Sequence, residues 1–158
     1  MQKKILRISA LITTAILLVG ALALPLSAKD KKQVTRPWKA LGLQTVLVTP
    51  ISLTEAVYHN EEYGNATHLG LTHNVGDGTM SLVTGKILTG EGTTTAANGD
   101  TLHWVWNGTE AVYDGGTGRF ENAYGFLVMT ILSQEMVSNG DGTLTVTAVD
   151  QLEGELTY

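Results

Sequence analysis

Residues 98–118, NGDTLHWVWNGTEAVYDGGTG, hold the pattern that decides the fold. Residues 101–107 alternate, and Leu102, Trp104 and Trp106 fall on one side of an extended chain, because successive side chains of a strand point to opposite faces. The Gly, Asn and Asp residues at both ends of the segment tolerate the positive φ angles of tight turns. The segment therefore predicts β-strands joined by tight reversals, with both tryptophans directed into a core.

The same turn chemistry punctuates the rest of the chain. Further clusters lie at residues 74–78 and 139–142, and each indicates a chain reversal. A helix is expected only at residues 53–63, where Thr54 could cap a glutamate-rich turn. Strands at this spacing without long helical insertions form a sandwich or a closed barrel. Alternation and β-branched enrichment place the expected strands at residues 41–48, 68–75, 80–89, 101–107, 111–113, 119–123, 126–137 and 144–152.

The N-terminal residues have the pattern of an export signal. Basic residues precede a nearly continuous apolar stretch at 8–24, and small residues end at Ala28. This order predicts a signal peptide, residues 1–28, with an uncleaved membrane anchor as the alternative. We expect a flexible charged lead-in at 29–37 and one domain at 38–158. The mature protein would be secreted or periplasmic, without a stable membrane anchor.

Charge and composition exclude several classes of protein. From residue 40 onward, two basic residues face fourteen acidic ones. Nucleic-acid binding depends on cationic side chains that displace counterions, so we expect no nucleic-acid partner. The chain has no cysteine, which excludes disulfides, thiolate zinc sites and cysteine nucleophiles.

Glycine-rich stretches of the chain resemble a known superfamily. Residues 92–102 and 115–125, with 65–70 and 154–158, resemble secreted bacterial proteins of unknown function. The stretch 115–125, GGTGRFENAYG, is similar to the Gly-Gly-Thr/Ser-Gly-x-Phe-x-x-x-x-Gly signature of the allene oxide cyclase and dirigent protein superfamily. The resemblance implies an all-β fold, a small antiparallel eight-stranded β-barrel. It implies nothing about activity, because the active-site residues of the plant enzymes have no matching positions here.

The glycine motif also has a physical interpretation of its own. Gly115, Gly116 and Gly118 allow a tight reversal, and Phe120 would plug the core on the next strand. Gly125 permits a kink or bulge where a barrel wall curves. We therefore treat these five residues as a structural motif.

The sequence contains no complete catalytic set, and we expect no cofactor. His68 and His73 differ by an odd number of residues and would point to opposite faces of a strand, so no metal site is expected. His73 could project into a barrel lumen, or it could be a hydrogen-bonded core histidine. The candidate ligand-binding residues, which could line or rim a lumen, are His73, Trp104, Trp106, Arg119, Glu121 and Tyr124.

Residues 126–132 are apolar on both faces. The face with Leu127, Met129 and Ile131 needs a cover, either an outer helix or a second copy of the chain.

The sequence leaves three alternative functions for the protein. The first is a non-catalytic module for small-molecule binding or for envelope or extracellular interaction. The others are a cyclase- or isomerase-like barrel enzyme acting on a small hydrophobic substrate, and a self-associating structural surface protein.

Overall fold

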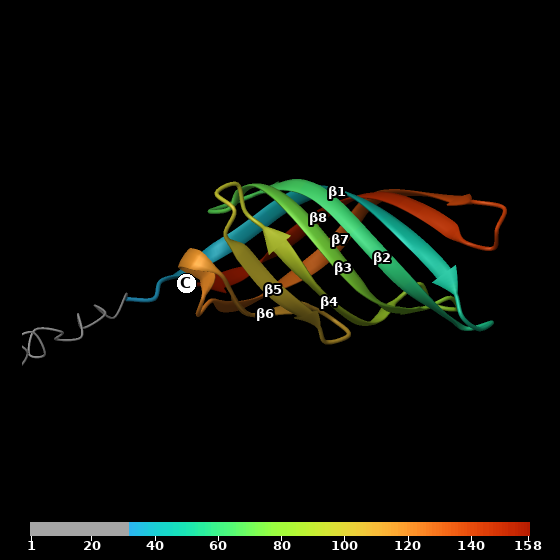
Figure 1. The fold of residues 1–158 in the computed structure, drawn as a ribbon, viewed down its shortest axis with the longest axis horizontal. Helices are drawn as coiled ribbons and strands as arrows, with labels where there is room; N and C mark the ends of the chain where they lie inside the picture. Colours follow the sequence, from blue (N-terminus) through green and yellow to red (C-terminus); the bar gives the residue numbers. More distant parts are fainter. Residues whose placement is uncertain (1–31) are drawn as a thin grey trace, which may run out of the picture. The chain divides into compact units, whose positions relative to one another are not determined.

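The computed structural model describes residues 32–158, so the expected signal peptide lies outside the described residues. Eight antiparallel strands pair in sequence order, and the last returns to the first to close a barrel (Figure 1). This confirms the predicted fold class. The strands are β1 (Thr35–Pro50), β2 (Glu55–Ala66), β3 (Gly70–Ser81), β4 (Ile87–Thr95), β5 (Thr101–Trp106), β6 (Ala111–Gly116), β7 (Tyr124–Ser138) and β8 (Leu144–Thr157), with a short 3₁₀ helix, η1 (Gly118–Phe120).

Four local predictions were wrong. Residues 74–78, expected to form a chain reversal, lie in the middle of strand β3. The helix expected at residues 53–63 is strand β2, because Ala56, Tyr58 and Glu62 alternate into the interior and both edges of β2 are paired. The strand expected at 80–89 is interrupted by a turn that contains Gly85 at φ 68°. Residues 119–123, expected as a strand, form no strand: Arg119 and Phe120 belong to η1, and a turn follows. In addition, β1 begins at Thr35, within the expected lead-in.

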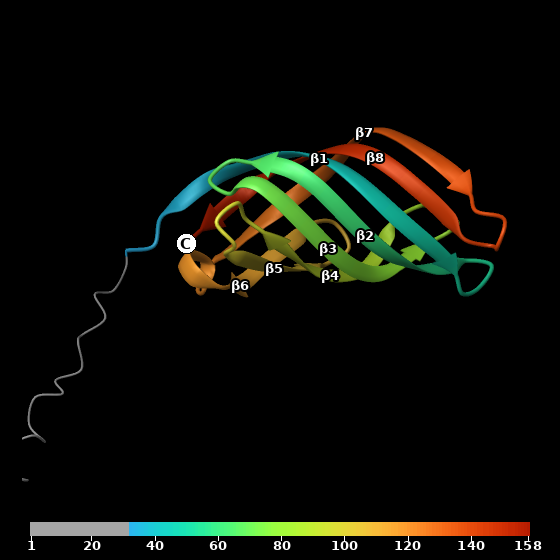
Figure 2. The ribbon, with the colours of Figure 1, turned by 45° about the horizontal axis from the view of Figure 1, so that its top comes forward.

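One end of the barrel is plugged by side chains. Phe120, Leu102 and Leu156 are all fully buried there, and η1 lies across this end (Figure 2). Phe120 meets the C-terminal Tyr158 edge-to-face, with ring centroids 5.2 Å apart. The expected pairing of glycine reversal and phenylalanine plug is therefore present, with Phe120 on η1 rather than on a strand.

The opposite end of the barrel has a lower wall on one side, and the buried cluster of Val48, Ala56 and Tyr58 lies in this half of the barrel. Strands β1, β7 and β8 have 16, 15 and 14 residues, whereas β5 and β6 have six each. The β1–β2 and β7–β8 turns reach farther from η1 than the β5–β6 turn (Figure 1). At this end the side chains of Ile131 and Met136 are 39% and 57% exposed, although their β8 partners Asp150 and Val146 belong to the inward-facing row.

Strand β7 corrects the expected subunit contact. Leu127, Met129 and Ile131 line the interior of the barrel, so they cannot form an outer surface for a second copy. The outward side chains are Phe126 and Val128, while Leu132 lies at a β-bulge between Ile131 and Ser133. Within residues 32–158 no helix covers this outer face. Self-association itself stays a prediction.

The described residues contain no helix with the length and hydropathy needed to cross a membrane.

Candidate functional site

The barrel encloses a cavity of about 180 Å³ that is the candidate site. An engineered apolar cavity of about 150 Å³ holds benzene, so this space suits a molecule built around one ring. It is smaller than the roughly 300 Å³ or more of pockets for drug-sized ligands. The aromatic lining consists of Trp38, Tyr58, Trp104, Trp106 and Tyr113, and the polar lining of Gln44, Asn60, Glu62, Thr72, Asn74, Thr94 and Gln134.

Glycines in the wall make room for the Trp104 indole. A Cβ atom added to Gly76 would lie 2.5 Å from Trp104 Cη2, and one added to Gly92 would overlap Trp104 Cζ2. Both positions are far inside van der Waals contact. The indole therefore lies against bare backbone of β3 and β4, and larger residues at either glycine would displace it.

A hydrogen-bonded chain connects Trp104 to Glu62. Trp104 Nε1 donates to Asn74 Oδ1 at 2.7 Å, and Asn74 Nδ2 donates to Glu62 Oε2 at 3.3 Å. The Thr94 hydroxyl also donates to Asn74 Oδ1. These bonds fix the orientation of the Asn74 amide, so that its Nδ2 donor faces the carboxyl group of Glu62.

A second carboxyl group lies beside Glu62. A Cβ atom added to Gly42 would overlap Glu62 Oε1 and would lie 2.8 Å from Asp150 Oδ1. The two carboxyl groups thus converge on the same point of the inner wall, where only glycine leaves space. Asp150 Oδ2 accepts a bond from Gln44 Nε2 at 2.8 Å, and Asn60 Nδ2 donates to Gln44 Oε1.

Burial favours the protonated form of both carboxyl groups. Burial first, and then the charge of Asp150, raise the pKa of Glu62 to about 7, against the opposing bond from Asn74. Burial raises the pKa of Asp150 to about 6, while backbone N–H groups of Asp150 and Gly42 act in the other direction. The pKa of Tyr113 is also raised, by burial and then by the charge of Glu62.

The interior provides no positive charge to balance this pair. Among the described residues, no Lys, Arg or His lines the cavity. The histidines at positions 59, 73 and 103 instead bond carboxylates on the outer wall. The site can therefore accept hydrogen bonds, exchange a proton near neutral pH, and enclose an apolar group.

Only two of the predicted ligand-binding residues line the cavity. Trp104 and Trp106 do so, as expected from their shared face. His73 lies on the outer wall, where its Nε2 bonds Glu61 and its ring stacks on Tyr63 at 4.4 Å. The reason is the register of the β2–β3 hairpin, which pairs Gly70 with inward-facing Ala66. Gly70 therefore faces inward, and every odd-numbered neighbour on that strand faces out.

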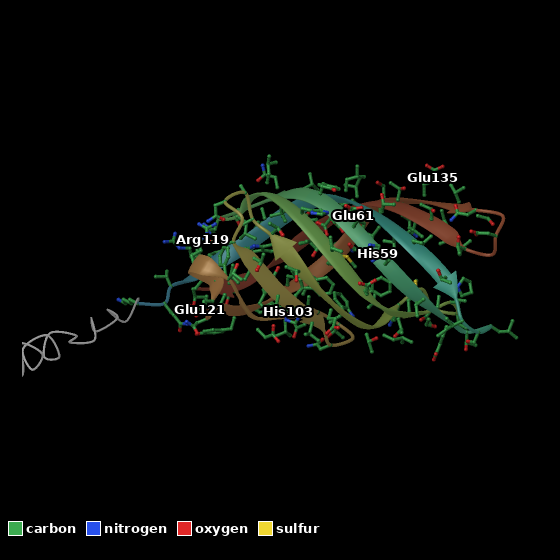
Figure 3. All side chains as sticks on the ribbon, in the orientation of Figure 1. His59, Glu61, His103, Arg119, Glu121 and Glu135 are labelled. Carbon is green, nitrogen blue, oxygen red and sulfur yellow. The ribbon has the colours of Figure 1, made fainter. Side chains whose placement is uncertain are left out.

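The three other predicted residues lie away from the lumen. Arg119 and Glu121 are at the η1 end of the barrel (Figure 3). The Arg119 guanidinium covers the Phe120 ring at 4.6 Å, and the side chain donates to the His68 carbonyl. Tyr124 is 54% exposed at the start of β7. None of these three residues lines the cavity.

The carboxyl pair was missed, although a signal for Asp150 existed. Leu144, Val146 and Ala148 are alternate residues on the inner face of β8. Asp150 follows Ala148 by two positions and therefore belongs to the same face. Glu62 gave a weaker signal, because it stands next to Glu61, and only the phase of β2 decides which of the two points inward.

No protein-family model matches the chain, and the search of curated proteins gives no significant match. Within the described residues no group of three or more His, Asp or Glu side chains is arranged to hold a metal ion.

Proposed function

We propose that this chain is an exported β-barrel protein that binds a small, mainly apolar molecule in its lumen without catalysis. The observation that carries the proposal is the cavity of about 180 Å³ with three tryptophans in its wall. Ligand sites in proteins are commonly concave, apolar and supplied with a few convergent polar groups. Here the polar groups are those of the Glu62, Asn74 and Gln44 network.

Export and superfamily membership belong to the same proposal. The basic, apolar and small-residue order of residues 1–28 supports export. The closed eight-stranded barrel is compatible with the allene oxide cyclase and dirigent superfamily. The glycine motif supports it further, since Gly115 and Gly118 have φ of 125° and 58° and a Cβ on Gly125 would overlap the Glu155 carbonyl oxygen.

Filling the lumen tests the binding function. Ala148 is buried and lines the cavity, so Ala148→Phe should weaken binding of benzyl alcohol by at least about tenfold, because the added ring occupies the ligand's space. The measurement is quenching of intrinsic fluorescence, since all three tryptophans of the chain line the cavity. Ala111→Leu, at another buried lining position, provides a second filled variant in case the first does not fold.

Thr147→Phe is the matched control, because Thr147 is the exposed neighbour of Ala148 on β8. It should bind the probe like the unmodified protein. Equal affinities in the filled variants and in the control would place any binding outside the lumen and contradict the proposal.

One observation favours an enzyme as the second candidate. Glu62 lines the cavity, and burial and Asp150 raise its pKa to about 7, which is the range in which a carboxyl group works best as general acid or base. A cyclase- or isomerase-like reaction on a small hydrophobic substrate would use this group. Turnover of a bound compound that Glu62→Gln abolishes while the compound still binds would favour this candidate over simple binding.

A further inference from the structure

We propose that the lumen selects a small organic cation, a protonated amine carrying about one ring, whose ammonium group bonds Glu62 beside Asp150. This inference rests on the proposed binding function and adds the charge of the ligand. It follows from four features of the site: the uncompensated carboxyl pair, the unused acceptor atoms, the aromatic walls and the available volume.

No basic side chain of the described residues forms an ion pair with Glu62 or Asp150. Glu62 is 5% exposed and Asp150 is fully buried, and their oxygens Oε1 and Oδ1 converge at Gly42. A buried carboxylate is stable only when it is paired or protonated. The basic side chains of the barrel that form ion pairs do so on its outside, as Lys39 does with Glu153 at 2.7 Å. A ligand cation would supply the missing charge.

The unused hydrogen-bonding atoms near this point include acceptors. Asn60 lines the cavity, and Asn60 Oδ1 and Asp150 Oδ1 are buried without a hydrogen-bond partner among residues 32–158. An ammonium group carries three donors and no acceptor, so it complements carboxylate and amide oxygens. Three buried donors also have no partner in the described part of the chain: Trp38 Nε1, Trp106 Nε1 and the Tyr113 hydroxyl. An ether or hydroxyl oxygen elsewhere on the ligand would accept hydrogen bonds from them.

The aromatic walls and the volume agree with such a ligand. Trp38, Tyr58 and Trp104 line the cavity together with Glu62, and the faces of such rings attract cations. The bonds from Trp104 to Asn74 and from Asn74 to Glu62 hold an aromatic wall and a carboxyl group in fixed relation. The cavity of about 180 Å³ leaves room for one ring beside the ammonium group.

Proton exchange makes binding of a cation dependent on pH. The ionisable groups that face Glu62 are Asp150 from β8 and Tyr113 from β6, whereas its β1 and β3 neighbours Gln44 and Asn74 are neutral amides. A cation binds the ionised carboxyl groups. Because burial and Asp150 raise the pKa of Glu62 to about 7, affinity for an amine should increase as the pH rises through that value, with release of a proton on binding.

The experiment compares three probes of similar shape with different charge: benzylamine, benzyl alcohol and benzoate. At about pH 8, where Glu62 is ionised, benzylamine should bind about ten- to a hundredfold more tightly than benzyl alcohol, as expected for a charge-assisted hydrogen bond. Benzoate should not bind. In Glu62→Gln the ratio of the two affinities should fall toward one, whereas the outward-facing Glu61→Gln should preserve it.

The outcomes separate this inference from the binding function. Binding of benzyl alcohol as tightly as benzylamine, or preferential binding of benzoate, overturns the inference and leaves the binding function standing. Competition by Ca²⁺ or K⁺ alone at the same concentration as the amine also overturns it, because the site would then take inorganic cations. Failure of all three probes to change tryptophan fluorescence contradicts the binding function as well.

Discussion

The folded protein should lose stability as the pH rises from about 5 to about 8, and Glu62→Gln should remove most of that loss. Burial and the Asp150 charge raise the pKa of Glu62 from 4.5 to about 7 in the folded state. Burial raises that of Asp150 from 3.8 to about 6. Ionising either group is therefore harder in the folded chain than in the unfolded one.

The direction follows from proton binding. Between its unfolded and folded pKa values, a raised carboxyl group holds more protons in the folded state, so the free energy of unfolding decreases with pH. For Glu62 the decrease spans about 4.5 to 7. One pKa unit corresponds to about 1.4 kcal/mol, so Glu62→Gln should raise the free energy of unfolding at about pH 8 by about 3 kcal/mol. Urea denaturation at both pH values measures it.

Glu61→Gln is the control for this prediction. Glu61 is the adjacent residue on the outer wall, and bonds from Tyr63 and His73 lower its pKa. Its substitution should therefore fail to stabilise the protein at high pH. A parent protein that is more stable at about pH 8 than at about pH 5, with Glu62→Gln less stable than the parent at the higher pH, would show that the interior carboxyl pair is not destabilising.

The second large effect is expected from removal of the plug. Phe120→Ala should lower the free energy of unfolding by about 3 to 5 kcal/mol, the usual cost of removing a buried aromatic ring. Phe120 is fully buried, contacts Tyr158, and is covered by the Arg119 guanidinium. Its loss would leave a cavity in the core cluster at this end of the barrel.

The chain contains one matched control for the plug, because it has only two phenylalanines. Phe126 is 38% exposed on the outer face of β7, and Phe126→Ala should cost about 1 kcal/mol or less, as is common for partly exposed positions. Urea denaturation of both variants under the same conditions makes the comparison. Equal losses would mean that η1 does not close the barrel.

The fold was predictable because turn chemistry and alternation are local properties. The Asn, Asp and Gly clusters at 98–100 and 139–142 lie at reversals in the structure, and Leu102 and Trp104 alternate inward on β5. The closing contact between β1 and β8 was implied by the family resemblance rather than by either strand alone, since pairing partners distant in sequence leave no local pattern.

The site was less predictable because, in part of the barrel wall, polar side chains face inward and hydrophobic side chains face outward. On β3, Thr72 and Asn74 face the lumen, while Leu71 is 71% exposed on the outer wall. Hydrophobic phase alone would place Leu71, and with it His73, inside. Polar residues can occupy the inner face here because they satisfy one another, as Asn74 does with Glu62, Thr94 and Trp104.

The short strands β5 and β6 also bear on kinetics. Since β1, β7 and β8 extend well beyond them, we expect a compound to enter over the low side of the wall without separation of paired strands. Exchange of the ligand would then require no slow opening of the sheet. The residence time of the ligand would depend on its affinity alone. Titrations followed by NMR should accordingly give averaged, gradually moving resonances for weak ligands.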